Sequence, residues 1–540
     1  MATESGSPRR ELTPALPQKR VLEDDHQPAV SSPLNPSFKD EPAARVARAK
    51  KESLKKREAK GGSHAPESSR ATPDPKSPRK EKTTLAPMRY KLPPPKLSDF
   101  EAPRSPVFTP HHTITTPDGT IEFNETSEHV HNKRNYRYTH CIADPAFPQS
   151  QFYRQSEAEP FGARISFEDT AGHMQLDESG RHVTTDKGFR MAKANVCARE
   201  GRWYWECKIT QGITQRNNEE SSPHVRMGFA RREATLDAPV GYGCYSYGLR
   251  DTAGQKVFAS RPKDFFPPGE SIEEGDVIGL EINLPSDTLH RKVVEGDYNP
   301  AVDLEDDEVR STSAPDIIVD RIPIRFKSHV YFEQIDYSPV KELEMLMNPS
   351  PDLSAAAIGA AAQKPSPTHA SPALRTLPHS SIKIYKNGNF MGTAFTDLLA
   401  FLPPASKPQE SARDGLDDGM LGYYPAISVF RGGAAEINLG PDFWYPPPVF
   451  EDNDDEVDMI GSDQPAPKTN KLRAMSERYD EQIVESLVQE MVDEVCFWEE
   501  AGGANGVAMA TSMQRSASDA AGLGPGMPSE EIKELVQDDE

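Results

Sequence analysis

The sequence predicts an all-β protein, an antiparallel β-sandwich in which two sheets pack face to face. Apolar and polar residues alternate in several stretches between residues 161 and 450, as they do in strands with one buried face. Residues that favour tight turns separate these stretches. Neither a βαβ rhythm nor an amphipathic helix of useful length interrupts them, so we expect few helices inside this region.

The first strands are expected in an N-terminal extension at 106–160. Residues 113–116 and 120–123 flank the turn sequence at 117–119, and this pattern predicts a β-hairpin. The extension also holds five histidines: His111, His112, His129, His131 and His140. Because no CxxC or HExxH motif accompanies them, we interpret these histidines as polar surface residues rather than as metal ligands.

The strands of the sandwich are expected in the main domain, at 161–450. Trp203, Trp205, Cys207 and Ile209 alternate with mostly polar residues, which predicts a strand with one apolar face. Further strands are predicted at 225–229, 278–284, 382–384, 426–430 and 436–439, with a hairpin turn at 386–388. Two segments interrupt this series, at about 285–320 and 349–380. The first carries an acidic run and the second is rich in Ala, Pro and Ser, so both are expected to be disordered loops.

Both ends of the chain are expected to be disordered. The chain has 540 residues, of which 36% are hydrophobic and 50 are prolines. Residues 1–100 contain 21 Lys and Arg against 13 Asp and Glu, a net charge of +8, so the other 440 residues carry −30 of a whole-chain charge of −22. The tail at 1–105 has too few apolar residues to offset the entropy of ordering, and 501–540 is rich in Gly, Ala and Ser and ends acidic.

The basic tail and the acidic body suggest separate partners. The segment 40–60 is a candidate helix that ends at a Gly pair. It is read either as a solvated charge run or as a segment that contacts DNA or import machinery. Its candidate contacts are Arg45, Arg48, Lys50, Lys51, Lys55, Lys56 and Arg57. The acidic body itself would repel phosphate, so it is not expected to bind DNA.

One amphipathic helix is predicted near the C-terminus, at 475–500. Its apolar stripe comprises Ile483, Val484, Leu487, Val488, Met491, Val492 and Val495. Acidic residues occupy the opposite side. The helix is expected either to dock on its own sandwich or, as its acidic linker favours, to enter a groove on another protein.

Several functional classes lack their sequence signatures. The five cysteines form no CxxC pair, which argues against zinc fingers and against a disulfide scaffold. We find no GxSxG, HExxH, P-loop or dinucleotide-binding motif, so we expect neither an enzyme nor a cofactor. The sequence starts without a signal peptide and contains no run of 18 apolar residues, which predicts an intracellular protein.

Several motifs in one order resemble an SPRY (B30.2-like) domain. These are GRWYWE at 201–206, RMGF at 226–229, GDVIG at 275–279, YKNG at 385–388 and YYPAIS at 423–428. Four further motifs resemble one subfamily: LDAPVGY at 236–242, SYGLR at 246–250, RFKSHVYFE at 325–333 and NLGP at 438–441. That subfamily is the SPRY subunit of COMPASS-type histone H3 lysine 4 methyltransferases, the Ash-two/Bre-two family, and a fungal form fits best.

The resemblance implies a non-catalytic nuclear scaffold without a cofactor. In the family, the SPRY domain binds the acidic or phosphorylated tail of a WD-repeat propeller subunit, and the pair activates a SET-domain methyltransferase. The resemblance assigns this surface to Phe189, Arg226, Pro239, Tyr242 and Arg250. Phe189 stands where the family pattern has an aromatic residue with a hydroxyl. The C-terminal helix lies where the family binds a small dimeric subunit of the Dpy-thirty/Sdc-one type.

The residues by themselves allow two interpretations of this surface. Arg226 and Arg250 are suited to bind carboxylates in fork geometry beside Phe189 and Tyr242. Alternatively, both arginines pair with acidic residues of the same body. At the level of function, the alternative to the methyltransferase scaffold is an SPRY substrate adaptor of a ubiquitin ligase, although no RING cysteines or cullin-binding helix are found.

Overall fold

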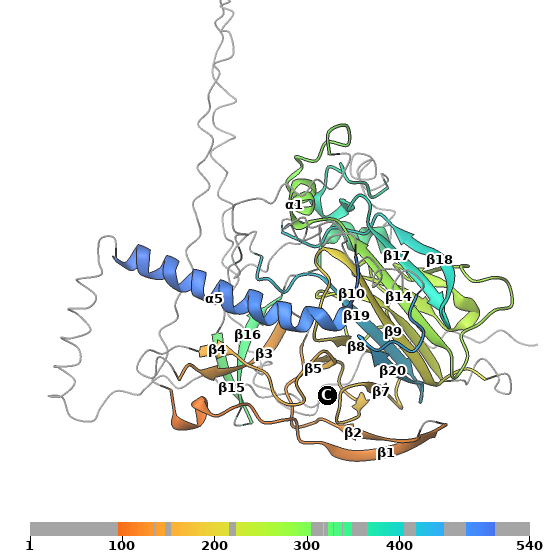
Figure 1. The fold of residues 1–540 in the computed structure, drawn as a ribbon, viewed down its shortest axis with the longest axis horizontal. Coiled ribbons are helices and arrows are strands. Elements are labelled where there is room, and N and C mark those ends of the chain that lie inside the picture. The colour runs from red at the N-terminus through yellow and green to blue at the C-terminus, as the bar shows by residue number, and fades with distance from the viewer. Residues whose placement is uncertain are drawn as a thin grey trace, which may run out of the picture. The chain divides into compact units, whose positions relative to one another are not determined.

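The structure, a computed structural model, describes most of the predicted domain and the C-terminal helix (Figure 1). The described residues are 95–117, 119–133, 135–145, 153–214, 223–303, 317, 322–327, 329–336, 339–347, 364–403, 405, 417–447 and 471–502, with the backbone alone for 493–502. The basic segment at 40–60 and the acidic end at 503–540 lie outside these residues, and so do parts of the two predicted insertions, at 304–316, 318–320 and 349–363.

Two large sheets form the body. The ten-stranded sheet has the order β1-β2-β6-β7-β20-β9-β14-β17-β18, with β21 paired to β9. Its strands are β1 (Thr109–Thr116), β2 (Gly119–Glu125), β6 (Gln175–Leu176), β7 (His182–Thr184), β9 (Gly201–Gln211), β14 (Val277–Leu284), β17 (Ser381–Lys386), β18 (Asn389–Thr396), β20 (Ala434–Asn438) and β21 (Leu472–Ala474). The pairing of β21 with β9 is parallel, whereas the other pairings between the described strands are antiparallel.

The seven-stranded sheet has the order β13-β12-β11-β10-β19-β8-β5. Its strands are β5 (Ile165–Thr170), β8 (Arg190–Ala194), β10 (His224–Arg231), β11 (Ser246–Arg250), β12 (Lys256–Phe258), β13 (Arg261–Lys263) and β19 (Tyr423–Phe430). A smaller four-stranded sheet has the order β15-β16-β3-β4. It consists of β3 (Tyr136–Ala143), β4 (Tyr153–Gln155), β15 (Ile322–Phe326) and β16 (His329–Ile335).

The two large sheets share one apolar core, which confirms the predicted sandwich. Trp205 of β9 and Leu280 of β14 face Met227 of β10 and Ile427 of β19 in a single cluster of buried side chains. The Trp205 and Phe229 rings meet edge to face across the two sheets, with centroids 6.1 Å apart. The alternation read from the sequence therefore identifies the side of these strands that faces the core between the two sheets. The hairpin predicted around 117–119 is also confirmed, as β1 and β2.

The expectation that the whole of 285–320 is a disordered loop was wrong. Residues Asp287–Glu295 form helix α1, whose N-terminus is capped by Ser286 and whose C-terminus ends at Gly296 in a left-handed conformation (φ 91°). The side chains of its Leu289, Val293 and Val294 are buried. The helix is too short for the sequence pattern to stand out, and it is stable here because its apolar side packs on the body.

The second insertion is also shorter than expected. Residues 364–380 are ordered, and they include the 3-10 helix η5 (Pro372–Leu374). Leu374 and Leu377 are buried. Leu374 packs with Leu343 of helix α2 (Lys341–Met347), which follows β16. Three further 3-10 turns are η2 (Leu97–Phe100), η4 (Thr252–Gly254) and η6 (Met475–Glu477).

The predicted C-terminal helix is present as α5 (Arg478–Gly502), which runs across the small sheet and beyond it (Figure 1). Within the part of the chain that is described, no helix is both long and apolar enough to span a bilayer.

Two of the five histidines that were expected on the surface are buried instead. His129 is 3% exposed and His140 is 4% exposed, so for these two the expectation was wrong. They are buried because the ring of Tyr331 in β16 packs against both of them and the ring of Phe167 in β5 packs against His129.

Candidate protein-interaction site

The first candidate surface lies on the face of the seven-stranded sheet that is turned away from the core. Val225 and Met227 are fully buried in the core, so Arg226 between them points to the outer face. In the strand register, Arg226 lies opposite Arg250 of β11 on one side and Ser428 of β19 on the other. The pairing of β10 with β11 therefore places two guanidinium groups side by side.

Aromatic rings border these arginines. The guanidinium carbon of Arg226 lies 4.5 Å from the centre of the Phe189 ring. Phe189 in turn packs against Phe430 of β19, with ring centroids 4.8 Å apart. We call Phe189, Arg226, Arg250 and Phe430 the arginine–aromatic surface. Flat rings beside a guanidinium group limit its contact with water and leave its edge available for hydrogen bonds.

Neither arginine of this surface is neutralised within the described part of the chain. No carboxylate there lies within ion-pair distance of Arg226 or Arg250, and the Nε of Arg250 is buried without a hydrogen-bond partner. The nearby carboxylate of Asp251 accepts hydrogen bonds from the backbone N–H groups of Val225 and Thr252 and lies 3.1 Å from His224. Burial, together with the positive charge of Arg250, lowers the pKa of Arg226 to about 10. Such a pair of cations favours an anionic ligand.

Pro239 and Tyr242 belong to a loop that covers part of the same outer face. The N–H of Val240 donates to the hydroxyl of Ser428, at 3.0 Å, and so fixes the loop beside Arg226. Gly248 makes this close approach possible, since a Cβ there would lie 2.6 Å from the carbonyl oxygen of Val240. Pro239 is half-buried, whereas Tyr242 is 47% exposed.

The structure therefore divides the five residues assigned from the sequence into two adjoining groups. Phe189, Arg226 and Arg250 form one group. Pro239 and Tyr242 line a hollow of about 1370 Å³ whose walls also include Arg190 and Met347. Sequence reasoning missed Phe430, although the alternation in β19 carried the signal: Ile427 and Val429 are core residues, so Ser428 and Phe430 face outwards with Arg226.

The second candidate surface is the apolar side of α5. Six residues of the predicted stripe are exposed: Ile483, Val484, Leu487, Val488, Met491 and Val492. Their exposed fractions range from 39% for Val492 to 63% for Met491. The side chain of Val495, the seventh residue, lies outside the described part. An apolar row of this length on one helix is typical of a surface that another protein covers.

Polar contacts hold the N-terminal half of α5 on the body, from its first turns to Gln489, which donates to the carbonyl oxygen of Ile317. Arg478 is buried, donates to the carbonyl oxygen of Cys197 at 3.1 Å and pairs with Glu481 and Glu485. Gln482 accepts from the N–H of Cys197 at 2.7 Å and donates to the carbonyl oxygen of Asn195 at 3.2 Å. The start of this helix therefore docks on the sandwich, whereas its apolar stripe stays exposed. Entry of the stripe into a groove on another protein stays a prediction.

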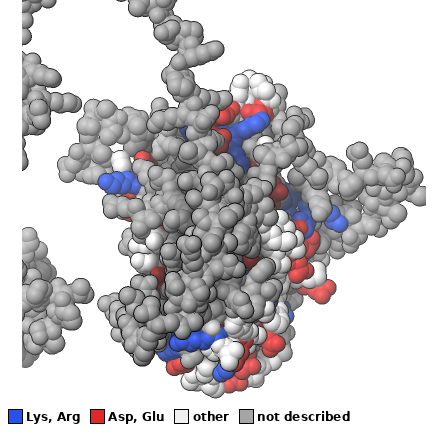
Figure 2. Space-filling view, turned by 90° about the vertical axis from the view of Figure 1, so that its left-hand side faces the viewer, with Lys and Arg blue, Asp and Glu red and all other residues white. Residues whose placement is uncertain are grey.

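The visible surface of the described residues has no large basic face in the view of Figure 2. Lys and Arg side chains alternate there with Asp and Glu side chains.

Comparison with known proteins gives close relatives over the length of the chain. A protein of Colletotrichum higginsianum described as "COMPASS component cclA" is 56% identical, with 100% of both chains covered. The "COMPASS component cclA" of Aspergillus fumigatus is 40% identical over 87% of this chain and 76% of its own. The "Set1 complex component ash2" of Schizosaccharomyces pombe is 37% identical over 91% of this chain and 62% of its own.

No family model matches the sequence. Among solved structures, a human SPRY domain covers 50% of this chain and 98% of its own at 12% identity, with a TM-score of 0.23. This likeness is too distant to support an argument about the site.

Proposed function

Because the chain belongs to the Ash2/Bre2 family of COMPASS (Set1 complex) components, we propose that it is a non-catalytic scaffold of a histone H3 lysine 4 methyltransferase complex. In this role it binds other subunits and, with them, stimulates a SET-domain methyltransferase in the nucleus. The observation that carries the proposal is the pair Arg226 and Arg250, which lie side by side without an ion-pair partner among the described residues.

The proposed ligand of the arginine–aromatic surface is the acidic tail of a WD-repeat subunit. Carboxylates or phosphates accept two parallel hydrogen bonds from a guanidinium group, and here they would also relieve the repulsion between two neighbouring cations. Phe189 supports the position of Arg226, and Tyr242 extends the contact on the loop side. The interpretation that both arginines pair with acidic neighbours receives no support from the described residues.

The proposed ligand of α5 is a small helical dimer of the Dpy-thirty/Sdc-one type. An exposed apolar stripe on a helix whose first turns are fixed fits a groove between two helices of a partner. For the basic residues at 45–57, we propose contact with nucleosomal DNA or with import machinery. These residues lie outside the described part, so their charge alone supports that contact.

The experiment is a calorimetric titration of the full chain with a peptide from the acidic tail of the WD-repeat subunit. Removing one arginine of a desolvated charge pair typically costs about 2–5 kcal/mol of binding free energy, so Arg226→Ala should weaken binding by well over tenfold. Lys327→Ala serves as the control, because Lys327 is an exposed cation in the turn between β15 and β16, outside the proposed surface. Equal affinity of wild type and Arg226→Ala would refute the assignment.

The ubiquitin-ligase adaptor is not favoured. The relatives that match over most of the chain are described as components of COMPASS or Set1 complexes. Co-purification would distinguish the two functions, because a SET-domain methyltransferase and WD-repeat proteins would accompany the scaffold, whereas cullin or ligase subunits would accompany the adaptor.

A further inference from the structure

Three side chains suited to binding a metal ion meet beside the small sheet, and none of them belongs to either candidate surface. His129 lies between β2 and β3, His140 lies within β3 and Glu168 lies within β5. Because these residues are far apart in the sequence, no short metal-binding motif contains them. The two histidines are buried and Glu168 is half-buried.

The distances between the three donor atoms match those of a metal site. The Nε2 of His129 lies 3.1 Å from the Oε1 of Glu168, and the Nε2 of His140 lies 3.6 Å from the same oxygen. All three donor atoms lie within 4.8 Å of one another. Tetrahedral zinc, with bonds of about 2.0–2.1 Å to imidazole nitrogen and carboxylate oxygen, places its donors about 3.4 Å apart.

His140 is the residue that a simple ion pair leaves unexplained. A hydrogen bond between His129 and Glu168, at 3.1 Å, satisfies those two groups without a metal. His140 is 4% exposed, and neither of its ring nitrogens has a hydrogen-bond partner among the described residues. Burying an imidazole in this way is unfavourable unless something binds it. A cation at its Nε2 would supply the missing partner.

The surroundings orient the other two ligands toward the same point. The Oε2 of Glu168 accepts from the hydroxyl of Ser166 at 3.0 Å, which leaves Oε1 facing the histidines. The Nδ1 of His129 lies 3.3 Å from the hydroxyl of buried Tyr331, which leaves its Nε2 available. The guanidinium of Arg164, which lies near this carboxylate, is paired with Glu157 at 3.0 Å, so part of its charge is already balanced.

We propose that His129, His140 and Glu168 form a zinc site that ties β3 to β5. Two imidazoles and one carboxylate suit Zn²⁺ better than Mg²⁺ or Ca²⁺, which prefer oxygen ligands. Three protein ligands leave one coordination position for water. His140 and Glu168 also line a hollow of about 320 Å³ that Gln482 and Leu487 of α5 border on the other side, so this position has room for a solvent ligand. The ion would thus fix the small sheet against the body beside α5.

The test uses the full untagged chain, stripped of metal with a chelator, and ZnCl₂ in competition with a chromophoric chelator. We expect one equivalent of Zn²⁺ to bind to wild type, and His140→Ala and Glu168→Gln to weaken binding by at least a hundredfold. His329→Ala is the matched control, because its ring lies 6.1 Å from that of His140 but outside the ligand set. Glu168→Gln keeps the side-chain shape, so a loss of binding with an unchanged circular dichroism spectrum cannot be ascribed to misfolding.

A second readout is the visible spectrum after substitution with Co²⁺, which absorbs strongly in tetrahedral sites. Tetrahedral bands that appear with wild type and with His329→Ala, but not with Glu168→Gln, would support the proposal. Absence of Zn²⁺ binding to the stripped wild type would overturn it. Binding of one equivalent with the same affinity in His140→Ala and Glu168→Gln would overturn it as well, because the ion would then occupy another place.

Discussion

Arg226 rests on the ring of Phe189, with 4.5 Å between the guanidinium carbon and the ring centre, while Arg250 lies opposite it on the next strand. Burial and the neighbouring cation both disfavour the charged form of Arg226, and together they lower its pKa to about 10. This arrangement does not maximise the stability of the isolated chain. It is the arrangement expected of a surface that is completed by an anionic partner.

The first prediction is that Arg226→Ala leaves the free energy of unfolding unchanged within about 1 kcal/mol, since no ion pair among the described residues is lost and repulsion from Arg250 is relieved. Arg232→Ala is the contrasting variant. Arg232 is a buried arginine that pairs with Asp336 at 2.7 Å and with Asp418, whereas Arg226 is half-buried. Its removal should cost about 3–5 kcal/mol. Urea denaturation measures both, and a large loss for Arg226→Ala would show that this arginine has a structural partner.

The second prediction concerns the apolar stripe of α5. Leu487 and Met491 are 48% and 63% exposed, so a double change of both to Asp should leave the melting temperature of the chain unaltered. The same change should abolish co-purification of the small helical subunit, because two carboxylates would be buried in the partner's groove.

The matched control for this double variant is Val302→Asp, which places a carboxylate on a side chain that is 72% exposed and lies outside α5. It should keep the small subunit. If the double variant also retains the subunit, the stripe does not bind it. If instead its melting temperature falls, the stripe packs on its own body.

The sequence predicts the strands of this fold well because their signal is local. In β9, Trp203, Trp205 and Cys207 alternate along the strand and all point into the core between the two sheets, as their sequence pattern predicts. Tyr204 lies between them on the other side of the strand and packs with Tyr385 and Leu472. The helix α1 has no comparable signal. Its nine residues include only three buried apolar side chains, and Pro285 and an acidic run flank it in the sequence.

In the candidate site, too, some features follow from the local sequence and others depend on contacts between distant parts of the chain. Arg226 points outwards because its neighbours Val225 and Met227 point into the core. Arg250 points outwards for the same reason, since its neighbour Leu249 is buried. The contact of Arg226 with Phe189 does not follow from any local pattern, because it depends on strand β19 pairing with β10 on one side and with β8 on the other. His129, His140 and Glu168 likewise meet only because the small sheet, which contains β3, packs beside β5 of the seven-stranded sheet. Long-range register is what the sequence alone cannot supply.

The third prediction is a pH dependence at His182 of β7. Its ring lies 3.3 Å from Asp177 and 3.5 Å from Glu436 of the adjacent strand β20. Burial by itself lowers the pKa of His182, but the hydrogen bonds and negative charges of these two carboxylates outweigh burial and raise it to about 9. The stabilisation is therefore complete below the unfolded pKa of about 6.5 and is lost as the pH rises through about 9.

His182→Gln should accordingly lower the free energy of unfolding by about 1–3 kcal/mol at pH 6 and by much less at pH 10. Urea denaturation of both proteins at several pH values measures this difference. His173→Gln is the control, since the side chain of His173 has no such carboxylate pair among the described residues. A destabilisation by His182→Gln that is the same at both pH values would contradict the assigned ion pairs.

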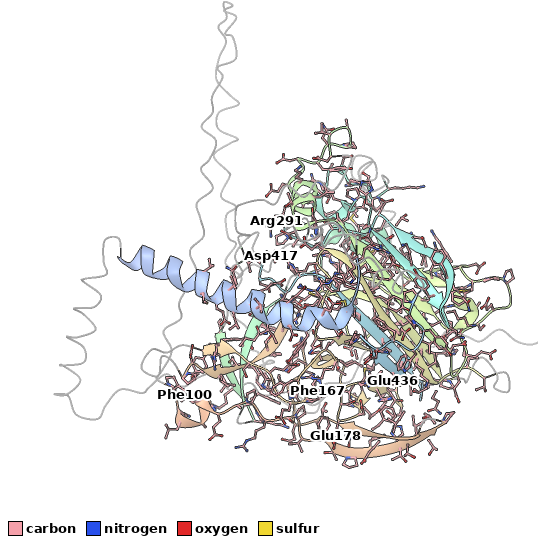
Figure 3. The ribbon with its side chains drawn as sticks, viewed as in Figure 1. Phe100, Phe167, Glu178, Arg291, Asp417 and Glu436 are labelled. Atoms are coloured by element: carbon pink, nitrogen blue, oxygen red, sulfur yellow. The ribbon has the colours of Figure 1, made fainter. Side chains whose placement is uncertain are left out.

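The fourth prediction concerns Asp417, which joins α1 to the body (Figure 3). Its carboxylate accepts from Arg199 at 2.7 Å and from Arg291 of α1 at 3.1 Å, and only 2% of the residue is exposed. Although burial opposes the charged form of Arg199, the charge of Asp417 raises the pKa of this arginine above its usual range. Asp417→Asn removes that charge and leaves the largely buried guanidinium of Arg199 without its main counterion, which should cost about 3–5 kcal/mol.

Urea denaturation gives the size of this loss, and hydrogen exchange shows where it acts. Because Arg291 connects α1 to Asp417, the amides of Asp287–Glu295 should exchange faster in Asp417→Asn than in wild type. Asp297→Asn removes one carboxylate just beyond the same helix, but from an exposed position, and should change neither quantity. Unaltered stability of Asp417→Asn would mean that α1 is held by its apolar side, through Leu289, Val293 and Val294, and that the two arginines find other partners when the carboxylate is lost.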